Sequence, residues 1–175
     1  MASESNGSPK RTTDGRFLVV GGRRWRASDP TIPEALRVQL VAELMAARRA
    51  VGQDPSAARP RVHDAKVALG ERGRPWWEPP TIASFRNRAR STTRTLLRHR
   101  DPDSSICPSD VARTIGGASW RSVLDDVRSA LATLADVGVV VATQRNEPID
   151  LRTARGPVRI RRGPHFPSDG SREKR

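Results

Sequence analysis

The stretch SICPSDVARTIGGASW, residues 105–120, contains the signals that decide the fold of the second half of the chain. Pro108 suits the first position of a helix, so Cys107 is the expected N-cap and Asp110 the expected acid at position N3. Gly116 and Gly117 can adopt the left-handed conformation that closes a helix. The stretch therefore predicts a short helix over residues 108–115 that ends in a tight turn.

A longer helix is expected on each side of this corner. Residues 82–99 place apolar side chains at helical spacing, and Pro102 closes that segment. After the corner, Ser119 is placed to cap a helix whose apolar face begins at Trp120 and which Gly138 ends. Three helices thus precede the strand-like part of the chain.

Two strand-like segments follow the third predicted helix. VVVATQ, residues 139–144, is rich in β-branched residues, and PVRIRR, residues 157–162, alternates apolar side chains with arginine. The order helix, helix, tight turn, helix and β-hairpin is typical of a winged helix-turn-helix, with the hairpin as its wing.

The first half of the chain predicts a smaller unit. In GRFLVVGGRRWRA, residues 15–27, strand-forming residues flank Gly21-Gly22, which is the composition of a tight hairpin turn. Residues 32–51 have the apolar spacing of a helix, and Pro33 suits its first turn. A loop over residues 52–60 is expected to lead into a shorter helix that Gly70 or Gly73 ends.

These segments predict an α+β chain with a winged helix-turn-helix C-terminal domain, preceded by a small unit of one β-hairpin and two helices, with disordered tails. Composition shifts set the boundaries. The predicted parts are a disordered tail (1–14), a small α+β unit (15–74), a Pro/Trp junction (75–81), a winged-helix domain (82–162) and a second disordered tail (163–175). Trp76 and Trp77 are expected to hold the two units together.

Both units resemble known bacterial proteins. Over about residues 82–162, the segments SICPSDVARTIGG, VATQR, PID and TARGPVRIR resemble the family known as domain of unknown function 3253. This resemblance implies a winged-helix-like fold and no characterised activity. In the first unit, GRRWRASDPTIPEALR, ELMAARRAV, DAKVALGERG and PWW are similar to short bacterial proteins labelled as Tol biopolymer transporters.

Arginine dominates the charge of the chain. The 32 lysines and arginines exceed the 19 acidic residues by 13, and only three of the 32 are lysine. Such a charge attracts polyanions, nucleic acid first, although codon bias in a GC-rich genome gives a similar composition. With one cysteine and no apolar run long enough to cross a bilayer, the chain is expected to be cytoplasmic, with no membrane partner.

Residue types that carry chemistry do not form a known motif. Cys107 lies at a helix N-terminus, which lowers a thiol pKa, but with no second cysteine to pair with it we interpret it as a structural N-cap residue. The three histidines lie in separate segments, and neither Gly-Gly pair has the spacing of a phosphate-binding loop. We therefore expect a non-catalytic protein with no catalytic residue, no metal site and no cofactor.

A row of arginines follows the first helix of the second unit. Arg86, Arg90, Arg94 and Arg98 recur every four residues, and no acid lies between Phe85 and Arg100. Like charges at this spacing destabilise a helix, so a phosphate backbone or an acidic protein surface would relieve the row. The alternative is a solvated helix face.

The predicted third helix and wing carry further basic candidates. Arg121 and Arg128 have Asp125 within pairing distance along the helix, so intrahelical ion pairs can absorb them. The wing has six arginines against Glu147 and Asp150, and wings commonly follow phosphates. The candidate nucleic-acid-binding residues are Arg86, Arg90, Arg94, Arg98, Arg121, Arg145, Arg152, Arg155, Arg159 and Arg161.

Two functions fit this pattern. The first is a nucleic-acid-binding or regulatory winged-helix protein that contacts mainly the phosphate backbone. The alternative is a protein-interaction adaptor that uses the same scaffold to bind an acidic protein partner. The pattern does not determine the oligomeric state.

Overall fold

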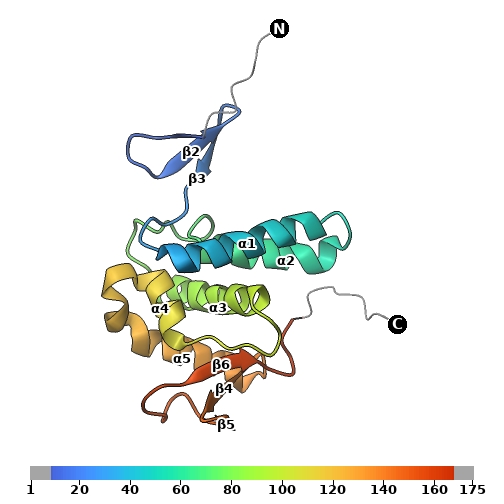
Figure 1. Cartoon of the computed structure of the whole chain (residues 1–175). Helices are drawn as coiled ribbons and strands as arrows, with labels where there is room; N and C mark the ends of the chain where they lie inside the picture. Colours follow the sequence, from blue (N-terminus) through green and yellow to red (C-terminus); the bar gives the residue numbers. More distant parts are fainter. Residues whose placement is uncertain (1–8, 168–175) are drawn as a thin grey trace.

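The structure is a computed structural model that describes residues 9–167, and it consists of α-helices and two small antiparallel sheets. The predicted α+β class is confirmed. The first sheet stands apart at one end of the molecule, the helices stack in the middle, and the second sheet lies at the other end (Figure 1). Among the described residues, no helix is both long and apolar enough to cross a membrane.

The first sheet contains the predicted hairpin. β2 (Phe17–Val20) pairs with β3 (Arg23–Arg26), and Gly21 and Gly22 form the turn with φ of 55° and 73°. β1 (Lys10–Arg11) adds a third strand beside β2. This strand corrects the prediction that all of residues 1–14 form a disordered tail, because a second reverse turn returns the chain onto β2. Residues 1–8 of that predicted tail lie outside the described part.

Two antiparallel helices follow the first sheet. α1 (Glu34–Ala50) is close to its predicted position, whereas α2 (Pro55–Ala68) begins five residues before Pro60. The loop predicted over residues 52–60 is therefore shorter than expected. Asp54 caps α2 by accepting hydrogen bonds from the backbone N–H groups of Ser56 and Ala57. Pro60 is exposed, so water can solvate the carbonyl that its missing N–H leaves free.

The three predicted helices of the second unit are present with one correction. α3 (Ile82–His99) has its predicted bounds, and α4 (Pro108–Gly116) begins after Cys107, whose N–H donates to Asp110 at 3.1 Å. Gly117 has a φ of 52°, and a Cβ there would lie 2.9 Å from Thr31 Cβ. The turn is thus pressed against the first unit.

The third helix begins later than predicted. A 3₁₀ segment, η1 (Gly117–Val123), precedes α5 (Leu124–Asp136), so Ser119 does not cap α5. Ser119 has non-helical angles, and its carbonyl instead accepts the Ser122 hydroxyl at 2.8 Å. Trp120 lies in the 3₁₀ segment, four residues before α5 begins. Its side chain is therefore only half-buried, against the edge of the core.

The second sheet has the order β5-β4-β6. β4 (Val140–Gln144) pairs with β6 (Arg159–Arg162), and β5 (Glu147–Pro148) extends the other edge. Val158 and Ile160 are buried while Arg159 is exposed, which is the predicted alternation. Ile106, just before α4, forms a bridge to Ile160 and ties this sheet to the helices.

One apolar core crosses the predicted boundary between the two units. It includes Leu40 and Leu44 of α1, Leu69 after α2, and Leu96 and Leu97 of α3. α1 and α2 pack directly on α3, so the two predicted units share this core. The division into residues 15–74 and 82–162 stays a prediction.

The start of the predicted C-terminal tail packs on the core. His165 N–H donates to the Gly138 carbonyl at 2.9 Å, and Phe166 packs against the core. The prediction of disorder is corrected for residues 163–167, since an aromatic ring and backbone hydrogen bonds fix them. Residues 168–175 lie outside the described part.

Candidate functional site

Three of the four arginines in the predicted row point into the molecule. Arg94 makes two hydrogen bonds to the Asp64 carboxylate, from Nε at 2.8 Å and from Nη2 at 2.6 Å. Arg98 reaches the same carboxylate at 2.7 Å, and its side chain is only 2 % exposed. Arg90 donates to Thr133 Oγ1 of α5 at 2.9 Å. The expectation that the row forms one exposed cationic stripe is therefore corrected.

Asp64 of α2 is the reason for this correction. Burial by itself raises the pKa of Asp64, but hydrogen bonds and charge from Arg94 and Arg98 outweigh it and hold the pKa below its ordinary value. Ser91 adds a hydrogen bond to the same carboxylate at 3.1 Å. A buried anion thus relieves the repulsion in the row, a role that the sequence pattern had assigned to an external phosphate or acidic protein.

Arg86, the first member of the row, lies apart from the other three. It is exposed and lines a groove of about 320 Å³ between the start of α3 and α5. Ile82, Phe85 and Val123 form the apolar part of that groove, and Ile82 is 73 % exposed. Asp126 and Ser129 of α5 border it on the other side.

The exposed face of α5 is acidic rather than basic. Asp125 and Asp126 are exposed near its N-terminus, where the helix dipole favours them. Neither arginine predicted to pair with Asp125 does so: Arg121 stacks on Trp120, 4.5 Å from the ring centroid, and Arg128 donates to the Ala154 carbonyl. The carboxylates are left facing solvent, which disfavours contact between phosphate and this helix.

The arginines of the second sheet divide into two groups. Arg152 pairs with Asp136, and Arg161 donates to the Asp103 carbonyl at 2.8 Å. Arg145, Arg155 and Arg159 are exposed and make no ion pair with any described residue. We call these last three residues the wing arginines, after the wing that the sequence predicts.

The turn between β4 and β5 presents one of the wing arginines. Arg145 and Asn146 have φ of 53° and 68°, the left-handed conformation of a tight hairpin turn. Arginine rarely adopts this conformation, so it occupies the tip at a cost in backbone strain. A broad groove of about 920 Å³ separates this sheet's long loop from α5, with Arg128, Arg152 and Arg155 among its lining residues.

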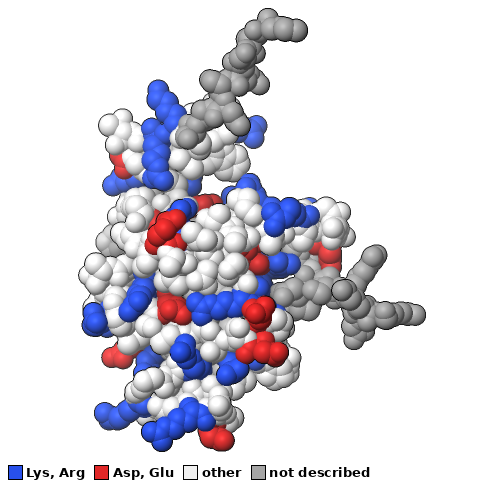
Figure 2. Space-filling view, in the orientation of Figure 1, with Lys and Arg blue, Asp and Glu red and all other residues white. Residues whose placement is uncertain are grey.

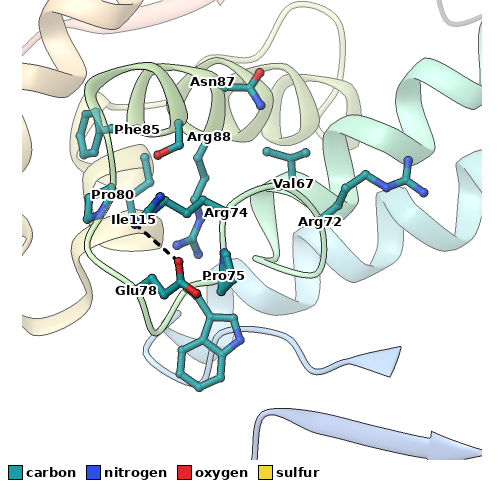
Figure 3. Close-up of a pocket in the computed structure, with 13 residues that line it drawn as sticks. Val67, Arg72, Arg74, Pro75, Glu78, Pro80, Phe85, Asn87, Arg88 and Ile115 are labelled. Atoms are coloured by element: carbon teal, nitrogen blue, oxygen red, sulfur yellow. Dashed lines mark ion pairs between the residues drawn. The ribbon is translucent and has the colours of Figure 1, made fainter. Parts of the chain in front are cut away.

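Arg88 lines a pocket and forms an ion pair, and the sequence pattern did not single it out. It extends from α3 toward the junction loop, beside a pocket of about 100 Å³ (Figure 3). Its Nη2 pairs with Asp29 at 2.8 Å, and its Nε donates to the Ala68 carbonyl at 3.3 Å. Arg88 thereby ties α3 to the first unit, and no local signal could have revealed a partner 59 residues away.

A second group of basic residues was also missed. The first sheet and the turns beside it carry Lys10, Arg11, Arg16, Arg23, Arg24 and Arg26. Basic side chains cover this sheet and the second sheet at opposite ends of the molecule, with basic and acidic groups mixed between them (Figure 2). The structure separates the predicted candidates instead of bringing them together on one face.

Residues considered for catalysis or metal binding lie apart from one another. Cys107 is half-buried at the N-cap of α4. Arg72 Nη1 lies 3.2 Å from His63 Nδ1, and His165 Nδ1 lies 3.0 Å from the Val137 carbonyl. Within residues 9–167, His, Cys, Asp and Glu side chains form no group of three that could hold a metal ion.

Comparison with known proteins agrees with the resemblance found for the second unit. Residues 86–163, from α3 to the residue after β6, match the family described as "Protein of unknown function (DUF3253)". This match leaves the first unit uncovered, so the likeness to Tol proteins has no support from it. No curated protein matches the chain. Over residues 86–163, the chain is thus similar to the family described as Protein of unknown function (DUF3253).

Proposed function

We propose that the protein is a non-catalytic nucleic-acid-binding or regulatory protein, in which residues 82–162 act as a winged-helix module. The observation that carries this proposal is the exposure of Arg145, Arg155 and Arg159, which have no carboxylate partner among the described residues. Free guanidinium groups on a protruding hairpin are suited to phosphate oxygens and to narrow grooves of DNA.

The proposal assigns binding to the wing and not to α5. Asp125 and Asp126 face solvent where a reading helix would meet base edges, so they oppose a close approach of phosphate. We therefore expect contact with the phosphate backbone, strong dependence on salt and a modest preference for sequence.

The test is a salt series of duplex DNA binding. The wing variant combines Arg145→Gln, Arg155→Gln and Arg159→Gln, and the matched control combines Arg48→Gln, Arg49→Gln and Arg59→Gln at exposed positions of α1 and α2. If each wing arginine contacts one phosphate, the slope of log affinity against log salt becomes shallower by about 2.7 in the wing variant. Equal losses in the two variants, or no binding by the wild type, would refute the proposal.

The adaptor function remains the alternative because of the apolar groove at Ile82. A side chain 73 % exposed beside Phe85 and Val123 is suited to contact with a protein. Under this alternative, a pull-down recovers a stoichiometric protein partner with the wild type and loses it with Ile82→Glu, while duplex DNA binding is absent from both.

A further inference from the structure

The β1–β3 sheet is the second strongly basic surface of the molecule. Residues 9–28 contain six basic side chains and one acid, Asp14. The sheet projects from the helices, which it meets where Lys66 of α2 lies over the Trp25 ring, and it lies at the opposite end from the β4–β6 sheet (Figures 1 and 2). Its charge therefore belongs to a different surface from the wing arginines.

Asp14 can offset only one of the six positive charges of this surface. Its carboxylate accepts hydrogen bonds from Thr12 Oγ1 at 2.6 Å and from the backbone N–H of Arg16 at 3.1 Å. These bonds fix Asp14 within the turn between β1 and β2, and it forms no ion pair with an arginine of the described chain. The cations of the sheet keep their charge available.

Aromatic rings hold several of these cations in place. The Arg24 guanidinium lies 4.4 Å from the Phe17 ring centroid, and the Arg16 guanidinium lies 5.0 Å from that of Trp77. The two rings meet edge to face at 5.6 Å. Stacking on a ring orders an arginine without consuming its hydrogen-bond donors, so less side-chain entropy is lost when it binds an anion.

The register places cations on the outer strands and apolar groups between them. Lys10, Val19 and Arg24 lie opposite one another across the three strands, so they share one face of the sheet. Neighbouring strands are about 4.8 Å apart, which puts the backbones of β1 and β3 about 10 Å apart. On this face, Lys10 of β1 and Arg24 of β3 thus flank an apolar strip on β2.

This spacing fits the groove of a B-form duplex. The major groove of B-DNA is about 12 Å wide and lies between two rows of phosphates, whereas the major groove of duplex RNA is narrow and deep. The turn at Gly21-Gly22 has no side chains to obstruct close approach, and Val19 lies between Lys10 and Arg24 on the face that would meet the duplex. An apolar side chain in this position can contact thymine methyl groups.

We infer that the β1–β3 sheet is a second nucleic-acid site, which docks over the groove of duplex DNA with Lys10 and Arg24 directed at opposite phosphate rows. This site is separate from the wing and does not depend on the function proposed for it. A molecule with both sites would contact DNA at its two ends.

The test uses a sheet variant with Lys10→Gln, Arg16→Gln and Arg24→Gln, which keeps Phe17 and Trp77. These three side chains make no hydrogen bond or ion pair to the helices, so thermal unfolding followed by circular dichroism should match the wild type. The wing variant and the α1–α2 control described above remove the same charge elsewhere. All four proteins are titrated with duplex DNA, single-stranded DNA, duplex RNA and anionic phospholipid vesicles over a salt series.

The expected result is specific to duplex DNA. The sheet variant binds it about tenfold more weakly than the wild type, and its salt slope is shallower by about 1.8 if Lys10 and Arg24 each contact one phosphate. The control should show a clearly smaller change in both quantities. Arg16 adds a third contact if the slope falls by about 2.7.

Several outcomes would overturn the inference. A sheet variant that behaves like the control excludes the site, and if the wing variant still loses binding, the proposed function stands without it. Loss confined to single-stranded DNA, duplex RNA or vesicles would assign the sheet to that other polyanion. If only the sheet variant loses duplex binding, the inference holds and the function proposed for the wing fails.

Discussion

Helix α3 and the β4–β6 sheet with its loops both carry several arginines, but the two sets have opposite surroundings. In α3, Arg94 and Arg98 converge on the buried carboxylate of Asp64 at 2.6 Å and 2.7 Å. In the sheet, Arg145 and Arg159 are exposed and have no carboxylate partner among the described residues. The denser row in the sequence is thus the one in which two arginines already share a carboxylate.

This difference shows why arginine spacing alone does not locate a binding surface. A guanidinium that is buried and paired contributes to stability and cannot reach a phosphate, whereas an exposed and unpaired one contributes little to stability and can. The two regions should therefore respond differently to mutation, pH and salt.

The largest expected effect is the loss of the Asp64 charge. Asp64→Asn removes the carboxylate that Arg94 and the buried Arg98 share, and breaking a buried pair in this way costs about 3–5 kcal/mol. Urea unfolding at neutral pH measures this loss. The control, Asp103→Asn at an exposed position, should change the unfolding free energy by less than about 0.5 kcal/mol. Equal effects of the two substitutions would show that the α3 arginines do not depend on Asp64.

A smaller effect is expected from acid. The pKa of Asp64 in the folded protein lies below its ordinary value of 3.8, so the carboxylate stabilises the fold fully above that pH. As the pH falls below 3.8, the unfolded chain binds the proton first, and the stabilisation is lost progressively down through the folded pKa. Unfolding of the wild type and Asp64→Asn at successively lower pH measures this contribution.

If the wild type and Asp64→Asn lose the same unfolding free energy as the pH falls, the charge of Asp64 does not stabilise the fold. The expected result is a steeper loss in the wild type, so that the difference between the two proteins shrinks below the ordinary pKa of an aspartate.

The smallest effect is expected for the exposed ion pair between the end of α5 and the loop that leads to β6. Arg152 and Asp136 are about half exposed, at 50 % and 52 %, so solvent and salt screen their attraction. Arg152→Gln should leave the urea midpoint at physiological salt unchanged within error, while Arg94→Gln should lower it clearly. A comparable drop for Arg152→Gln would mean that pairing matters more than burial for these arginines.

The sequence predicted the elements that short-range signals define. The bounds of α3 follow from its apolar spacing, and the start of α4 follows from Cys107 and Pro108. The hairpin of β2 and β3 follows from Gly21-Gly22, because a turn with positive φ at both central positions favours glycine. Each of these signals acts over four or five residues.

The predictions that failed involve competition between local signals or contacts from distant segments. Ser119 had the composition of a cap, but Gly117 is pressed against Thr31 and a 3₁₀ segment follows. The tail after residue 162 read as disordered because the sequence did not reveal that Phe166 packs against the core.

The sequence by itself determined the approximate places of the helices, the β2–β3 hairpin, the excess of positive charge and the likeness of residues 86–163 to their family. Only the tertiary structure decided which arginines remain free, because the attraction between charges depends on their separation in space and on burial. Asp64 lies 30 residues before Arg94 in the chain and 2.6 Å from it in the fold. Because Asp64 occupies Arg94 in this way, the exposed basic side chains of the two sheets are better candidates for a binding surface than those of α3.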